Sequence, residues 1–272
     1  YAKSVAMLGI YLLPVVCMYL VHLPSWAVLL CFAVSGVGVA GVGMSVMHDA
    51  NHGAYSHKPW VNTLMGGTLN LMGGFDVNWR FQHNILHHTY TNITHLDEDI
   101  DQRVKMRWSP HFKYHPIQRF QHIYAFLAYC LSTWSWVLIK DFRQFYEYTH
   151  NGINNRSRPQ LIWDFTKMML FKLAYFTYII VLPISLLHYG AGLIIGGFML
   201  CHAIGGFILS TIFQLAHVVE GAEFPMPNEK HEIETEWAIH QMRTTADFGH
   251  KSKLLTWYTG GLTHQIEHHL FP

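Results

Sequence analysis

Eight histidines of this 272-residue chain fall into three clusters and one further position, each beside a long apolar run. The clusters are His48-Asp49-Ala50-Asn51-His52, His83-Asn84-Ile85-Leu86-His87-His88 and Gln265-Ile266-Glu267-His268-His269, and the single histidine is His217. Neutral imidazole is the commonest protein ligand for transition metals. Residues four apart share one face of a helix, so His48 with His52, and His83 with His87, can each hold one ion.

Two of the clusters contain adjacent histidines, which are His87-His88 and His268-His269. Neighbouring residues on a helix point about 100° apart, so each pair can serve two ions that lie side by side. Eight imidazoles are too many for one ion and suit two ions that keep open positions. A single histidine is more often a surface or core residue, and His217 could also cap the carbonyls of a helix end. Three clusters beside membrane-length runs nevertheless favour metal binding.

The composition predicts an integral membrane protein. Apolar residues make up 51% of the chain and charged residues 13%, which is about half the charged fraction of a typical globular protein. The formal net charge of +1 gives no reason to expect a nucleic-acid partner. The four cysteines all lie in apolar runs without metal-binding spacing, so we expect buried thiols and no disulfide framework.

Five apolar runs must position the histidines. They are Val5–Val21, Trp26–Met47, Ile123–Ile139, Met168–Leu187 and Gly192–Phe213. A helix needs about 20 residues to cross a bilayer. The links 22–25 and 188–191 are short and carry no Lys or Arg, whereas the basic residues gather in the histidine-bearing stretches. The positive-inside rule therefore predicts two tight hairpins, with the histidines on the cytoplasmic face.

The histidine clusters must meet on one side of the membrane, so the number of crossings between His88 and His217 must be even. Three runs lie in that interval, and we expect Ile123–Ile139 to lie on the cytoplasmic surface because it is short and contains polar residues and two tryptophans. The stretch Val61–Phe75 is too broken to span. The expected fold is all-α, with four transmembrane helices in two hairpins and a cytoplasmic helical cap.

One glycine-rich segment has a different explanation. Residues Gly36-Val37-Gly38-Val39-Ala40-Gly41 match a dinucleotide-binding pattern, but inside an apolar run this pattern indicates close helix packing.

Redox-metal ligands with open positions suit the oxidation of unactivated C–H bonds. Hydrogens on saturated carbons have no acidity, and such carbons carry no leaving group, so acid–base and nucleophilic groups cannot attack them. Iron acting with O2 and two electrons can remove these hydrogens. That chemistry needs redox-metal ligands and open coordination positions, which the histidine clusters would supply. Zinc could occupy the same ligands but could not perform the redox step.

The motifs HDANH, HNILHH and QIEHHLFP resemble the three histidine boxes of the membrane fatty acid desaturases. The similarity runs from Met44 to Pro272, and Gln265 resembles the front-end branch, which inserts a double bond between an existing one and the carboxyl end. The resemblance implies one membrane desaturase domain over residues 1–272, with both termini trimmed. It also implies two iron ions, with O2 as co-substrate. The implied ligands are His48, His52, His83, His87, His88, His217, His268 and His269.

Other side chains near the boxes are candidates for supporting roles. Gln265 would bind metal weakly or hydrogen-bond a ligand, and Asp49, Glu267 and the pair Asp97/Asp99 are candidate acceptors for the second N–H of a ligating histidine. Trp79 and Arg80 precede the second box. We expect them to help hold the substrate head group, although a structural role for Trp79 is an equal alternative.

The expected activity is that of a front-end fatty acyl desaturase, an enzyme of lipid metabolism. We expect an acyl-CoA or acyl-lipid as substrate and cytochrome b5 or ferredoxin as electron donor. The membrane would be the endoplasmic reticulum or a bacterial inner membrane. A hydroxylase or ketolase on the same scaffold remains open, as does a sphingolipid desaturase. A metal transporter or receptor is the alternative from another class. Transporters place ionisable ligands at the bilayer midplane, whereas these clusters lie just outside the apolar runs.

Overall fold

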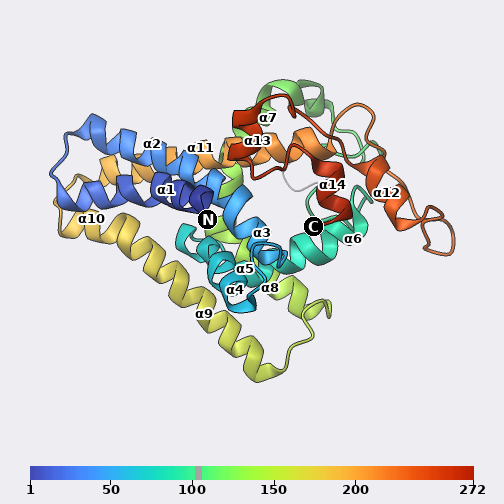
Figure 1. The fold of residues 1–272 in the computed structure, drawn as a ribbon, viewed down its shortest axis with the longest axis horizontal. Coiled ribbons are helices and arrows are strands. Elements are labelled where there is room, and N and C mark those ends of the chain that lie inside the picture. The colour runs from blue at the N-terminus through green and yellow to red at the C-terminus, as the bar shows by residue number, and fades with distance from the viewer. Residues whose placement is uncertain (102–105) are drawn as a thin grey trace. The chain divides into compact units, whose positions relative to one another are not determined.

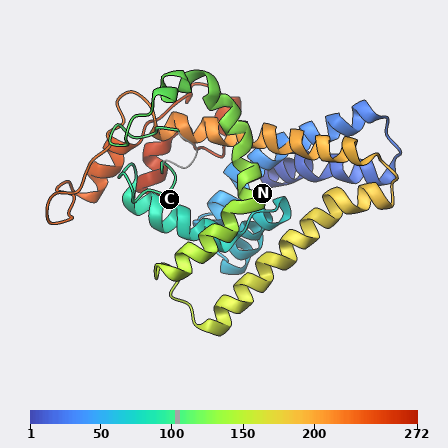
Figure 2. The same ribbon diagram turned by 180° about the vertical axis from the view of Figure 1, so that it is seen from behind.

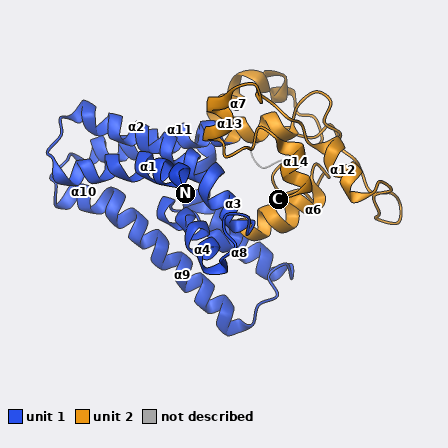
Figure 3. Cartoon of the chain, viewed as in Figure 1, with its two compact units in different colours: residues 1–78, 129–209 blue, residues 79–128, 210–272 orange. Residues whose placement is uncertain are grey.

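The computed structural model describes residues 1–101 and 106–272, and this part of the chain is helical without a β-strand (Figure 1). The chain forms two compact units (Figure 3). Unit 1 contains residues Tyr1–Asn78 and Tyr129–Leu209, and unit 2 contains residues Trp79–Ala128 and Ser210–Pro272. The chain passes from one unit to the other within three helices, α5, α7 and α11. The all-α prediction is therefore confirmed for the described residues.

Most of the long helices belong wholly or partly to unit 1. They and the shorter elements between them are α1 (Ala2–Leu20), α2 (Ser25–Val42), η1 (Gly43–Met47), α3 (His48–Asn51), α4 (Pro59–Gly66), η2 (Gly67–Met72), α5 (Asp76–Arg80), α7 (Gln121–Ser135), η5 (Trp136–Lys140), α8 (Asp141–His150), α9 (Arg158–Phe176), η6 (Thr177–Val181), α10 (Leu182–Ser185) and α11 (Ala191–His217). Unit 2 adds η3 (Phe81–His87), α6 (His88–Tyr90), η4 (Pro116–Phe120), α12 (Trp237–Thr244), α13 (Lys253–Tyr258) and α14 (Gln265–Leu270).

Among the residues that the structure describes, five continuous helices are long and apolar enough to cross a membrane. They are Ala2–Leu20, Ser25–Asn51, Pro116–His150, Arg158–Ser185 and Ala191–His217. The chain is thus a membrane protein with several candidate spans. The third helix runs through η4, α7, η5 and α8 and is longer than the apolar run Ile123–Ile139 that it contains. Val61–Phe75 covers most of α4, all of η2 and the three residues that follow, and it contributes to none of the five.

Helix α2 packs closely against α1 and α11 in unit 1, and both views of the ribbon show the three side by side (Figures 1 and 2). Small residues make this approach possible. A Cβ atom at Gly36 would lie 2.5 Å from the Cys201 carbonyl oxygen of α11, and one at Gly38 would collide with the backbone of Tyr11 in α1. The glycine pattern at 36–41 therefore serves helix packing, as predicted from its place inside an apolar run.

A buried ion pair ties α9 to two other parts of unit 1. The ammonium group of Lys172 lies 2.8 Å from the Asp141 carboxylate, and both side chains are almost completely buried. The same ammonium donates to the carbonyl oxygens of Gly73 and Val137, each at 2.8 Å. The ammonium therefore has a counter-ion and two carbonyl acceptors, which is the condition under which a buried charge is tolerated.

The backbone beside this pair leads directly into the histidine-bearing part of the chain. Gly73 has a left-handed conformation with a φ of 82°, which glycine adopts without steric cost. Asn78 donates from its side-chain amide to the Asp141 carbonyl oxygen at 2.7 Å. Lys172 and Asp141 thus fix the segment that immediately precedes Trp79 and the second histidine box.

Replacing Lys172 with Met should lower the free energy of unfolding by about 3–5 kcal/mol, because it leaves the Asp141 carboxylate buried without its counter-ion. Lys167→Met is the matched control, since Lys167 in the same helix pairs with Asp164 while partly exposed and should cost no more than about 1 kcal/mol. Denaturant unfolding of the purified protein in detergent measures both. Equal losses in the two variants would show that the buried pair has no special weight.

Candidate metal centre

Six of the eight predicted ligands lie in unit 2, on three segments that are distant in sequence. Helices η3 and α6 carry His83, His87 and His88, His217 is the last residue of α11, and α14 carries His268 and His269. Element η3 is a π-helix, whose hydrogen bonds join residues five apart and which often occurs at functional sites. In this geometry His83 contacts both following histidines, with ring centroids 5.2 Å from His87 and 4.8 Å from His88.

Three of these histidines, His87, His217 and His269, form a fully buried group, and none of the three side chains is exposed. One nitrogen from each ring lies within 4.8 Å of the others. The ring centroids are 4.6 Å apart for His87 and His217, 5.0 Å for His87 and His269, and 4.9 Å for His217 and His269. Three imidazoles at this spacing can converge on one ion.

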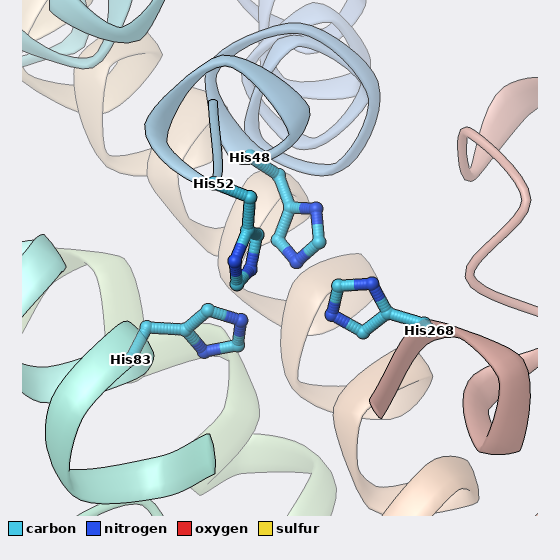
Figure 4. A group of neighbouring side chains, drawn as sticks. All are labelled: His48, His52, His83 and His268. Carbon is cyan, nitrogen blue, oxygen red and sulfur yellow. The ribbon is translucent and has the colours of Figure 1, made fainter. Parts of the chain in front are cut away.

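The other three histidines of unit 2 lie beside this group. The Nε2 atoms of His83 and His88 are 3.3 Å apart, and the ring of His268 stacks towards His83 with a centroid distance of 6.2 Å (Figure 4). His88 also stacks on His269 at 4.3 Å. In each adjacent histidine pair, one ring belongs to the buried group (His87 or His269) and the other lies beside it (His88 or His268).

The first histidine box belongs to unit 1. His48 and His52 project from the same side of one helix turn, and their ring centroids are 4.7 Å apart (Figure 4). Nδ1 of His48 lies 3.3 Å from an Asp49 carboxylate oxygen. The predicted pairing of residues i and i+4, and the proximity of Asp49 to a histidine ring, are both present within this unit.

A buried carboxylate fixes the orientation of His87. Nδ1 of His87 lies 3.0 and 3.1 Å from the two oxygens of Asp97, which is itself fully buried. Burial lowers the pKa of His87, but the charge and hydrogen bond of Asp97 outweigh it, with a smaller contribution from Asp99, so that the pKa is raised overall. A carboxylate only accepts hydrogen bonds, so Nδ1 carries the proton and the lone pair lies on Nε2.

His269 has the opposite electrostatic environment. Its Nδ1 lies 2.8 Å from the Oε1 atom of Gln241, which is a neutral acceptor. Burial lowers the pKa of His269, and the neighbouring histidines His217, His87, His88 and His268 lower it further. The ring is therefore held neutral, the form in which imidazole binds metals.

The hydrogen-bond partners of the ring nitrogens indicate that the buried group could hold a metal ion. Within the described residues, the buried Nε2 atoms of His87 and His269 make no hydrogen bond. A buried polar atom without a partner costs free energy. The Nδ1 atoms of the same two rings are held by acceptors. This is the arrangement that metal-binding histidines have in proteins. The donor set suits a transition metal.

The predicted supporting residues differ in their burial and in their distance from the histidines. Gln265 is buried, with its Nε2 3.3 Å from Nε2 of His217. Glu267 is exposed and lies near Asp247 and His264. Trp79 is buried and packs on His83 with a centroid distance of 4.5 Å, whereas Arg80 is half-buried at the end of α5.

Four buried polar residues hydrogen-bond to the histidine-bearing segments, a role that their spacing in the sequence does not show. They are Thr91, Asn92, His240 and Gln241, all buried. The Asn92 amide contacts the carbonyl oxygens of His217, Glu223 and Thr244 at 2.9, 3.2 and 3.0 Å. The pair Thr91-Asn92 could be noticed beside the second box, but nothing in the polar segment around α12 distinguishes His240 or Gln241.

The comparisons with known proteins agree with this geometry. The profile of the fatty acid desaturase family matches residues 24–272. The sn-1 linoleoyl-lipid 6-desaturase of Arthrospira platensis is 36% identical over 248 residues, which cover 91% of this chain and 66% of the relative. The enzyme of the same name from Synechocystis sp. is 35% identical, covering 88% of this chain and 66% of the relative. Delta(5) fatty acid desaturase A of Dictyostelium discoideum is 34% identical, covering 97% and 58%.

The chain spans just under two thirds of the length of the first two relatives and less of the third. The family match, in contrast, extends over nearly all of the chain and includes every histidine box. Together with the membrane-length helices and the buried histidine group, this match shows that the chain belongs to the fatty acid desaturase family.

Proposed function

We propose that this protein is an O2-dependent front-end acyl-lipid desaturase that contains two iron ions. The observation that carries the proposal is the buried group of His87, His217 and His269. In this group the Nδ1 atoms of His87 and His269 are held by acceptors, and their Nε2 atoms are left for a metal. The family match gives the reaction class. A transporter would place its ligands at the bilayer midplane, and neither the family nor the box positions favour one.

All eight histidines are proposed ligands: His48, His52, His83, His87, His88, His217, His268 and His269. The six in unit 2 are supported by their mutual distances. His48 and His52 are included because of their spacing in the first box and the family membership. Bound iron would supply the oxidising power that removes two hydrogens from adjacent carbons. In the balanced reaction the substrate and the external donor each give two electrons, so that O2 is reduced to two waters.

The protein's own side chains would hold and insulate the ions. Asp97 and Gln241 fix the rings of His87 and His269, so these ligands need no reorientation when metal binds. The burial of these side chains keeps bulk water from the metal-facing nitrogens. Gln265 places a neutral amide beside His217. An amide is a weaker iron ligand than imidazole, so we assign Gln265 to tuning the site rather than to holding an ion.

The front-end assignment rests on Gln265 in the third box and on the relatives. Their names specify 6-desaturation of a linoleoyl-lipid and Δ5 desaturation of fatty acids. A new double bond at these positions lies on the carboxyl side of the existing ones in polyunsaturated chains. The same oxidant could instead transfer oxygen, so a hydroxylase is the second candidate within this family. We propose cytochrome b5 or ferredoxin as the electron donor.

Feeding a saturated and a polyunsaturated acyl chain side by side tests the proposed function. Expressed in a host without polyunsaturated lipids, the protein should desaturate the polyunsaturated chain on the carboxyl side of its first double bond. Gas chromatography with double-bond location by mass spectrometry measures the product. A hydroxylated product would favour the second candidate. Mid-chain desaturation of the saturated substrate alone would contradict the front-end assignment and leave the desaturase proposal intact.

For the membrane topology we propose four crossings, with Ile123–Ile139 lying along the cytoplasmic surface and the histidines facing the cytoplasm. The helix Pro116–His150 that contains this run meets the length and hydropathy requirement for a span but has the lowest hydropathy of the five, with a mean of 1.3. It is also the least buried within the protein. The even number of crossings required between the second box and His217 supports the surface position.

Cysteines introduced at the exposed positions Lys113 and Arg158, on either side of this helix, should both react with a membrane-impermeant reagent from the cytoplasmic side. The four native cysteines are first replaced by serine or alanine. A cysteine at exposed Gly190, in the link between α10 and α11, is the control and should react only from the opposite side. Labelling of Lys113→Cys and Arg158→Cys from opposite sides would establish a fifth crossing.

A further inference from the structure

Helix α12 contains none of the histidine boxes, yet one of its side chains reaches two of them. Gln241 is fully buried. Its Oε1 atom lies 2.8 Å from Nδ1 of His269, and its Nε2 atom donates to the backbone carbonyl oxygen of His88 at 3.0 Å. One amide thus joins the second box to the third within unit 2.

The carbonyl of His88 decides which way this amide points. A backbone carbonyl oxygen only accepts hydrogen bonds, so the NH2 group of Gln241 must face it. The amide oxygen then necessarily faces His269 and the Thr91 hydroxyl, whose Oγ1 lies 3.0 Å away. The same hydroxyl lies 2.7 Å from the carbonyl oxygen of His87. A neighbouring residue strengthens this connection, because His240 Nε2 lies 2.9 Å from the carbonyl oxygen of Thr91.

The amide orientation in turn decides the tautomer of His269. An amide oxygen cannot donate, so Nδ1 of His269 must carry the proton and Nε2 must carry the lone pair. This Nε2 atom is the one that is buried without a hydrogen-bond partner among the described residues. A side chain outside the boxes therefore determines which nitrogen of a box histidine can bind metal.

We infer that Gln241 is a positioning residue for the metal centre, which holds His269 in its ligating tautomer and makes it a weaker donor than His87. The two rings lie in one buried group but have different acceptors, a neutral amide behind His269 and the Asp97 carboxylate behind His87. Hydrogen bonds to ionised acceptors are about twice as strong as neutral ones, so His87 donates more electron density to its ion. This inference rests on the proposed metal centre.

Two substitutions separate the role of Gln241 in orienting His269 from a role in folding alone. Gln241→Met keeps the size of the side chain and removes both hydrogen bonds. Gln241→Glu keeps an acceptor for His269 and makes it charged, while it removes the N–H donor to the His88 carbonyl oxygen. Met242→Leu is the control, because Met242 is the next residue of the same helix and is exposed. Each variant is purified in detergent and loaded with iron, or with Co(II), whose visible absorption reports on its ligands without turnover.

We expect wild type and Met242→Leu to bind two ions with the same Co(II) spectrum. Gln241→Met should lose about 10–100-fold in metal affinity at one ion, with a matching loss of kcat. Gln241→Glu should retain both ions and show a shifted Co(II) spectrum, because its charged acceptor strengthens donation by His269. Wild-type affinity and spectrum in both Gln241 variants would overturn the inference.

If Gln241→Met does not fold, Gln241→Glu decides alone, and an unshifted Co(II) spectrum would overturn the inference. Failure of the underlying metal centre gives a different result, because wild type and Met242→Leu would then bind fewer than two ions.

Discussion

A buried imidazole can present the lone pair of Nε2 to a metal only if the proton on Nδ1 has an acceptor. The rings of His87 and His269 meet this constraint in the buried group that they form with His217. Asp97 supplies the acceptor for His87 and Gln241 supplies it for His269, while the Nε2 atoms of both rings are left without hydrogen bonds in the described structure. Without these acceptors the rings could rotate or change tautomer, and the metal would have to compete with both processes.

The acceptors themselves are held by the segment after the second box. Asp97 also accepts the backbone N–H groups of Asn92 and Asp99, each at 2.9 Å, so its buried charge is satisfied from several sides. Asn92 adopts a left-handed conformation with a φ of 58°, which asparagine tolerates better than most residues. From there its amide contacts three carbonyl groups, one of them that of His217. The segment 91–99 therefore connects the orientation of His87 to the end of α11.

The same principle gives the two rings different electronic properties. Asp97 is charged and raises the pKa of His87, whereas the environment of His269 lowers its pKa. Since both rings belong to the group proposed to hold one ion, that ion would have a stronger and a weaker imidazole donor. Within unit 1, Lys172 and Asp141 hold the backbone at Gly73 and the side chain of Asn78, the last residue of its N-terminal segment.

The features that could be predicted from the sequence are those set by residues close together along the chain. The histidine boxes follow from their spacing, the long helices from continuous apolar runs, and the packing role of Gly36 and Gly38 from their place in such a run. Asp97 was one of several candidate acceptors, and only the fold shows that it is buried against His87. The π-helical form of η3 was missed, because the spacing of four between His83 and His87 hides the contact of His83 with His88.

Gln241 could not be found from the sequence, because its two partners are far from it along the chain and its segment has no periodic pattern. The number of crossings does not follow from length and hydropathy, since the helix Pro116–His150 meets the requirements for a span while its central run carries polar residues and tryptophans typical of a membrane surface.

Anomalous scattering at the iron edge from crystals of the iron-loaded protein tests the central claim most directly. The account predicts two iron peaks, one of them bonded to His87 and His269 through their Nε2 atoms at about 2.0–2.2 Å, a distance typical of metal–imidazole bonds. His217 should bind the same ion, while Nδ1 of His87 stays on Asp97 and Nδ1 of His269 stays on Gln241. Iron bound through either Nδ1 atom, or no iron at this buried group, would contradict the account.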